Sequence, residues 1–101
     1  MTVNKKIDGT TAIVGVEGRL DTMTAGQLDT EVKQVLSGDV SELVFDFAQL
    51  EYISSAGLRV LLSSQKAMNA KKGSMVIRNA NELILDVFEV TGFIDILTVE
   101  K

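Results

Sequence analysis

The stretch Asp46–Leu62, "DFAQLEYISSAGLRVLL", joins the end of an apolar strand to a long aliphatic run through two adjacent serines. Ser54 and Ser55 follow a predicted strand and precede a predicted helix. A serine oxygen at a helix start accepts a hydrogen bond from the free N–H groups of the first turn, which contributes about 1 kcal/mol. Only one residue is the N-cap, so the second hydroxyl is free for another role.

A phosphate on that second hydroxyl would lie at the positive end of the helix dipole, beside unpaired amides. It would add about −1.5 to −2 charges to the surface. The physics that favours a cap therefore also favours a phosphoserine. Gly57 follows directly, although glycine in a helix interior costs about 1 kcal/mol relative to alanine. One explanation is close approach of another backbone, from either a packed neighbour or a bound protein.

The composition predicts a single domain over residues 1–101, with 46% hydrophobic and 24% charged residues. The net charge of −4 does not favour direct nucleic-acid binding, which usually needs a basic face. The start, "MTVNKKIDGT", lacks the apolar core of a signal peptide, and no apolar run approaches the roughly 20 residues of a membrane span. We expect a cytoplasmic, soluble protein without membrane insertion.

The chain contains neither cysteine nor histidine. Disulfides, thiolate chemistry, Ser-His-Asp catalysis and histidine-containing zinc sites are therefore excluded within this chain. The acids Asp46, Glu51 and Asp86 lack metal-ligand spacing, and no nucleotide-binding glycine motif is present. The sequence predicts a protein that is not an enzyme and has no cofactor.

Four segments read as strands or as part of a hairpin. Thr11–Gly18 is rich in β-branched residues, and "TVNKKID" before it is expected to pair with it through Asp8-Gly9, a strong turn dipeptide. Ser41–Phe47, "SELVFDF", is typical of a central strand, and "SMVIRN" predicts another strand after it.

Three helices follow from apolar spacing. Their apolar residues are Leu28, Val32, Val35 and Leu36; then Leu58, Leu61, Leu62 and Met68; then Leu83, Ile84, Val87 and Phe88. Thr24 and Gln27 have capping-box spacing, Gly92 suits a C-cap, and Ile94–Glu100 suggests a short last strand. We predict an α/β fold with a mixed four- to five-stranded sheet and three to four helices, in the order β-β-α-β-α-β-α.

Asp21 lies in the segment Gly18–Ala25, "GRLDTMTA", between a strand end and a helix start. An acid at that point is typical of a turn or an additional cap. If the strands ending near Gly18 and Phe47 are neighbours, Asp21 also lies near the two serines. It would then orient a hydroxyl or contact a partner.

Three segments, in order, resemble the STAS domain of bacterial anti-sigma factor antagonists. "VEGRLDTMTAGQL" resembles the Gly-x-Leu-Asp segment of the family. "ELVFDFAQLEYISSAGLRVLL" resembles its central strand, loop and second helix, with Asp-Ser-Ser/Thr/Ala-Gly-Leu. "VFEVTGF" resembles its third helix, which often ends in Gly-Leu or Gly-Phe. The resemblance covers nearly the whole chain.

The resemblance implies a mixed sheet with helices, no catalytic activity, and regulation by phosphorylation. In such systems an anti-sigma factor, which is also a serine-protein kinase, phosphorylates the serine or threonine after the Asp. A metal-dependent phosphatase of the PP2C type reverses this. The unmodified antagonist binds the anti-sigma factor and frees the sigma factor.

Alignment of Ala56-Gly57-Leu58 with the small-Gly-Leu of the family implies Ser55 as the phosphoacceptor, with Ser54 where the family commonly has Asp. Two alternatives follow from this departure. Ser55 is the acceptor in a variant loop, with Ser54 as the fallback assignment, or the domain binds constitutively without phosphorylation. The partner-binding residues implied by the resemblance are Asp21, Ser54, Ser55, Ala56, Gly57 and Leu58.

A second function from another class stays open. STAS-like domains also serve as non-enzymatic accessory subunits of lipid-transport or sensory complexes, where the serine loop would be structural or would contact an ATPase subunit. Neighbouring genes for a kinase and a phosphatase, or for a transporter, would discriminate between the two.

Overall fold

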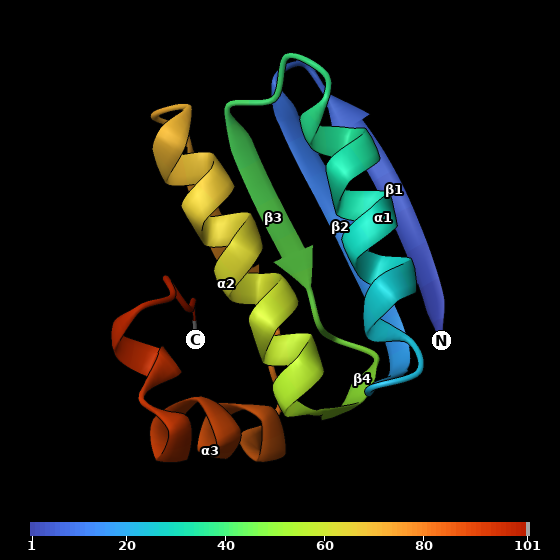
Figure 1. Cartoon of the computed structure of the whole chain (residues 1–101), viewed down its shortest axis with the longest axis vertical. Coiled ribbons are helices and arrows are strands. Elements are labelled where there is room, and N and C mark those ends of the chain that lie inside the picture. The colour runs from blue at the N-terminus through green and yellow to red at the C-terminus, as the bar shows by residue number, and fades with distance from the viewer. Residues whose placement is uncertain (101) are drawn as a thin grey trace.

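The computed structural model describes residues 1–100, and α1 and α2 lie side by side over one face of a mixed β-sheet (Figure 1). The elements are β1 Thr2–Asp8, β2 Thr11–Leu20, α1 Ala25–Leu36, β3 Glu42–Asp46, β4 Leu50–Ile53, α2 Ser55–Ala70, β5 Ser74–Arg78, α3 Glu82–Thr91 and a 3₁₀ turn, η1, at Phe93–Asp95. The helix α3 lies across the end of the sheet at which α2 begins (Figure 1).

The sheet has the strand order β1-β2-β3-β5, with β4 paired to β2 outside this path. β1 and β2 form the antiparallel hairpin predicted from Asp8-Gly9, and Gly9 takes the positive φ of 63° that the tight turn needs. The pairs β2–β3, β3–β5 and β2–β4 are all parallel. The prediction of a mixed α/β sheet is confirmed.

Buried and half-buried residues alternate along β2, and this alternation defines the two faces of the sheet. Ala12, Val14 and Val16 are buried in one core with residues of α1 and α2, whereas Ile13 and Gly15 are only half-buried. This period of two is what a strand requires when helices cover one of its faces.

The central position of β3 explains its continuous apolar run. Leu43, Val44 and Phe45 are all buried, and the Phe45 and Phe47 rings lie 5.7 Å apart between centroids in a tilted arrangement. The strand predicted at Ser41–Phe47 is thus present and lies between two parallel neighbours.

The strand β4 is absent from the predicted element order, which is wrong at this point. The strand pairs with β2, about thirty residues upstream, through Gly18–Leu50 and Leu20–Ile53. Its buried residues, Leu50 and Ile53, are three positions apart, so the short segment lacks the period of two that marks a strand. The serines therefore follow β4 and not β3.

The strand predicted at Ile94–Glu100 is also wrong. The N–H groups of residues 95–97 turn back to the carbonyls of Gly92 and Phe93, which forms η1 and removes these groups from any ladder. A single bridge between Ile77 and Val99 remains beside β5.

Capping residues fix α3 against the rest of the domain. The Asn81 Oδ1 accepts from the Ile84 N–H at 2.9 Å, and the Asn81 Nδ2 donates to the Leu50 carbonyl at 3.0 Å. Gly92 takes a left-handed conformation at φ 80°, which confirms it as the C-cap. One side chain thus starts α3 and ties it to β4.

Candidate functional site

Two of the sequence candidates, Asp21 and the serine junction (Ser54-Ser55), lie directly after the ends of β2 and β4. Leu20 pairs with Ile53, and the Ser54 N–H donates to the Leu20 carbonyl at 2.9 Å. Asp21 and Ser54 are therefore the next residues along two parallel neighbours. The structure brings Asp21 close to the serine junction, as the sequence suggested, although the neighbouring strand is β4.

The two serines take different positions. Ser54 is the N-cap of α2, with extended backbone, and its Oγ accepts from the Gly57 N–H at 3.3 Å. Ser55 is the first residue of the helix and is exposed. The N-terminal end of α2 therefore presents the Ser55 hydroxyl to solvent while Ser54 performs the capping role.

Hydrogen bonds hold the Asp21 carboxylate within its own turn. Its Oδ1 accepts from the N–H groups of Met23 and Thr24 at 3.0 and 3.1 Å, and the Thr24 hydroxyl lies 3.1 Å away. The Asp21 N–H in turn donates to Thr24 Oγ1 at 2.9 Å. The capping box predicted from Thr24 and Gln27 is wrong. The Thr24 side chain bonds Asp21 and accepts no hydrogen bond from the first turn of α1.

This turn makes the stability of the domain depend on the charge of Asp21. Partial desolvation raises the pKa of its carboxyl, but the bonds from Thr24 and Met23, with the charge of Arg19, outweigh it and hold the pKa below the ordinary value of 3.8. The turn thus depends on the ionised form.

We expect Asp21→Asn to make the free energy of unfolding depend less on pH in the acid range. A lowered folded-state pKa contributes stability that is fully present above about pH 4 and is lost as the pH falls through the folded-state value. Thermal unfolding between pH 2 and 7 measures this, with Asp39→Asn, an exposed acid in the α1–β3 loop, as the charge-matched control. An Asp21→Asn profile that parallels the native one would contradict the role of these bonds.

Gly57 lies against side chains of both strand ends. A Cβ at this position would lie 2.7 Å from Leu20 Cγ and 2.9 Å from Ile53 Cγ1, which is closer than packed atoms allow. Of the two explanations for this glycine, the structure supports the packed neighbour, and side chains rather than a backbone make the approach. The junction is therefore closely packed onto β2 and β4.

The six candidate residues differ in exposure. Ser55 is exposed, Asp21, Ser54 and Ala56 are half-buried, and Gly57 and Leu58 are buried, Leu58 being 4% exposed. The two buried residues can shape a partner surface only by supporting their neighbours, so any direct contact belongs to the other four.

A shallow groove of about 320 Å³ runs between α1 and α2 from the serine junction. Its lining residues are Ala25, Gly26, Asp29, Ala56, Arg59, Val60 and Ser63. Met23, just before α1, is 92% exposed, an unusual position for a large apolar side chain. Met23 and Arg59 were not among the sequence candidates. The sequence signal that could have indicated this groove was a set of small residues at the starts of the two helices: Ala25, Gly26 and Ala56.

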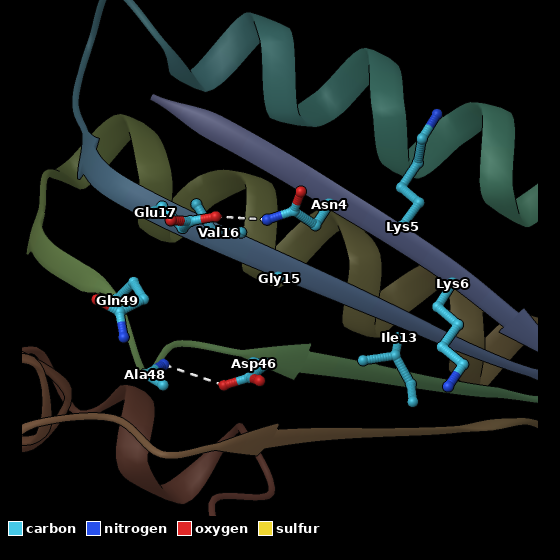
Figure 2. A pocket seen from close by; sticks show the side chains of 10 residues that line it. All are labelled: Asn4, Lys5, Lys6, Ile13, Gly15, Val16, Glu17, Asp46, Ala48 and Gln49. Atoms are coloured by element: carbon cyan, nitrogen blue, oxygen red, sulfur yellow. Dashed lines mark hydrogen bonds between the residues drawn. The ribbon is translucent and has the colours of Figure 1, made fainter.

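A second hollow, of about 400 Å³, lies on the face of the sheet that α1 and α2 leave open (Figure 2). Its two acids are already bonded: Asn4 Nδ2 donates to Glu17, and Asp46 Oδ1 accepts from the Ala48 N–H at 3.0 Å. No sequence candidate lines it.

Two absences within residues 1–100 concern metal binding and membrane crossing. No group of three or more acidic side chains there is placed to hold a metal ion. In the same range, no helix has the length and apolar character that crossing a membrane requires.

Known proteins match this chain over nearly its full length. The family model described as "Mlab, STAS domain" matches residues 3–98. A Bordetella bronchiseptica protein, BtrV, assigned provisionally as an anti-sigma factor antagonist, is 35% identical over 94 residues, 93% of this chain and 80% of BtrV. The anti-sigma-B factor antagonist of Listeria monocytogenes is 30% identical over 88 residues, 85% of this chain and 75% of the relative.

Solved structures share the fold at lower identity. The anti-sigma factor antagonist SpoIIAA, 18% identical, matches in its unphosphorylated form with a TM-score of 0.85, over 99% of this chain and 89% of that one. Its phosphorylated form, from Bacillus, matches with a TM-score of 0.77, over 99% and 92%. The chain belongs to the STAS-domain family and groups within it with the bacterial anti-sigma factor antagonists.

Proposed function

We propose that this chain is an anti-sigma factor antagonist controlled by phosphorylation of Ser55. Its unmodified form binds an anti-sigma factor that is also a serine kinase, and this binding releases the sigma factor. The observation that carries the proposal is the exposed Ser55 hydroxyl at the start of α2, beside a cap already made by Ser54. The relatives named as antagonists support the first part, and the two forms of SpoIIAA support the second.

The contacts of the two serines favour Ser55 over Ser54 as the acceptor. Ser54 Oγ accepts from the Gly57 N–H, and the Ser54 backbone is bonded to Leu20. A kinase would have to break the cap to reach that oxygen. Ser55 needs no such rearrangement because it is exposed in the first turn.

Charge, and not a change of fold, carries the signal in this proposal. A phosphate on Ser55 adds about −1.5 to −2 charges at the helix N-terminus, where the dipole tolerates them. The same charge lies at the rim of the surface formed by Asp21, Met23 and the α1–α2 groove. On that surface it must be desolvated against the partner, which weakens binding.

The partners supply the chemistry. The kinase transfers the γ-phosphoryl group of ATP to the Ser55 oxygen, with ADP leaving and the hydroxyl proton passing to a base of the kinase or to solvent. A PP2C-type phosphatase hydrolyses the ester to serine and inorganic phosphate. The chain itself is a binding module without a cofactor.

The proposal is tested with a complex of the cognate anti-sigma factor and its sigma factor. Titrating the unphosphorylated chain into their complex should release free sigma factor, observed by size-exclusion chromatography. BtrV titrated in parallel gives a related comparison. Absence of release, with copurification of transporter subunits instead, would favour the accessory-subunit alternative.

A further inference from the structure

The exposed side of α3 carries two parallel stripes of different character. At about 100° per residue, Leu83, Val87 and Val90 lie along one line of the helix. Leu83 is 54% and Val90 87% exposed, while Val87 is half-buried. This apolar stripe lies beside the buried residues Ile84 and Phe88 that attach α3 to the core.

The second stripe is acidic. Glu82, Asp86 and Glu89 follow at spacings of four and three residues, and all three are exposed. None of them takes part in an ion pair within residues 1–100. Like charges at these spacings repel, and an acid near a helix C-terminus opposes the dipole. Asp86 and Glu89 therefore cost α3 stability, whereas Glu82 lies in the first turn, where the dipole favours an acid.

These stripes match one kind of occupant. An amphipathic helix packs by placing its apolar stripe along another, and a row of Lys or Arg beside it would pair with the acids. Anionic lipid surfaces and nucleic acids are repelled by the same acids, and so is a second copy of this face. Charge complementarity therefore selects a basic amphipathic segment.

We propose that α3 is a second docking surface, formed by the stripes Leu83-Val87-Val90 and Glu82-Asp86-Glu89, for a basic amphipathic helix of a partner protein. It goes beyond the serine junction, which none of these six residues forms. Because Asn81 ties α3 to β4 through the Leu50 carbonyl, the surface is held rigidly at the same end of the domain (Figure 1).

The probe is a synthetic 18-residue peptide with a leucine stripe bordered by lysines, and its control is a scrambled peptide of equal charge. Titrated into ¹⁵N-labelled native chain, the peptide should shift the backbone amides of residues 82–91 in NMR spectra. The scrambled peptide should bind at least about tenfold more weakly, because its leucines cannot be buried together. No binding up to about 1 mM, or shifts centred on another element, would overturn the proposal.

Variants locate the two stripes separately. Leu83→Ser/Val90→Ser should weaken peptide binding by about tenfold or more, and Asp86→Asn/Glu89→Gln by about fivefold at low salt. The charge-matched control, Asp8→Asn/Asp39→Asn, alters exposed acids at the β1–β2 turn and in the α1–β3 loop and should change binding less than twofold. Equal effects from the control and the α3 acids would reduce the interaction to net charge and refute the docking surface.

Discussion

Replacing Ser55 by aspartate is expected to weaken binding to the anti-sigma factor by about a hundredfold, whereas Ser55→Ala keeps binding near the native level. A charge left unpaired in a desolvated interface costs about 2–5 kcal/mol, and about 3 kcal/mol corresponds to that factor. Ser55→Ala removes only an exposed hydroxyl that takes no part in the Ser54 cap. Isothermal titration calorimetry against the anti-sigma factor measures both.

Radiolabelled ATP and the cognate kinase then identify the acceptor. We expect no label on Ser55→Ala and full label on Ser74→Ala, a matched change of an exposed serine at the start of β5. Ser54→Ala should still accept label, with a folding penalty of about 1 kcal/mol from the lost cap. Label retained by Ser55→Ala and lost from Ser54→Ala would assign the phosphate to Ser54.

Gly57→Ala is expected to destabilise the domain. The added methyl would lie 2.7 Å from Leu20 Cγ and 2.9 Å from Ile53 Cγ1, and overpacking of this kind typically costs about 1–3 kcal/mol. The higher helix propensity of alanine offsets at most about 1 kcal/mol of this cost, so the net effect is destabilising. Denaturant unfolding measures the change. Because Leu20 and Ile53 precede Asp21 and Ser54, binding to the anti-sigma factor should also weaken.

Gly26→Ala provides the matched control in α1. Apart from the chain neighbours and the backbone of α1 itself, no atom lies within 4 Å of a Cβ at this position, so the same substitution should stabilise the domain by up to about 1 kcal/mol. If Gly57→Ala were as stable as Gly26→Ala, the close packing of α2 onto the ends of β2 and β4 would be wrong.

The sequence predicted the elements whose patterns are local. The hairpin at Asp8-Gly9, the helix stripes and the apolar run of β3 each follow from turn chemistry or periodicity within a few residues. β4 could not be predicted in this way, because only its pairing with β2 makes Leu50–Ile53 a strand. The last predicted strand failed for a related reason, since the 3₁₀ turn after Gly92 competes for the same backbone groups.

The candidate site could be predicted in position but not in detail. A strand-to-helix junction with two serines predicts one cap and one free hydroxyl, and that division is present. Thr24 is the N-cap residue of α1, but its side chain bonds Asp21 and makes no cap bond, and this choice depends on competing hydrogen bonds within one turn. Exposure of Met23 depends on where that turn points, which no local pattern encodes.

The hydrogen bond from the Ser54 N–H to the Leu20 carbonyl closes the junction before any partner arrives. A preformed loop loses little conformational entropy on binding, so association needs a correctly oriented collision and no ordering step. Rates of about 10⁵–10⁷ M⁻¹ s⁻¹ are typical of such encounters. The rate of switching would then be limited by the kinase and the phosphatase, and no slow conformational step of the domain would add to it.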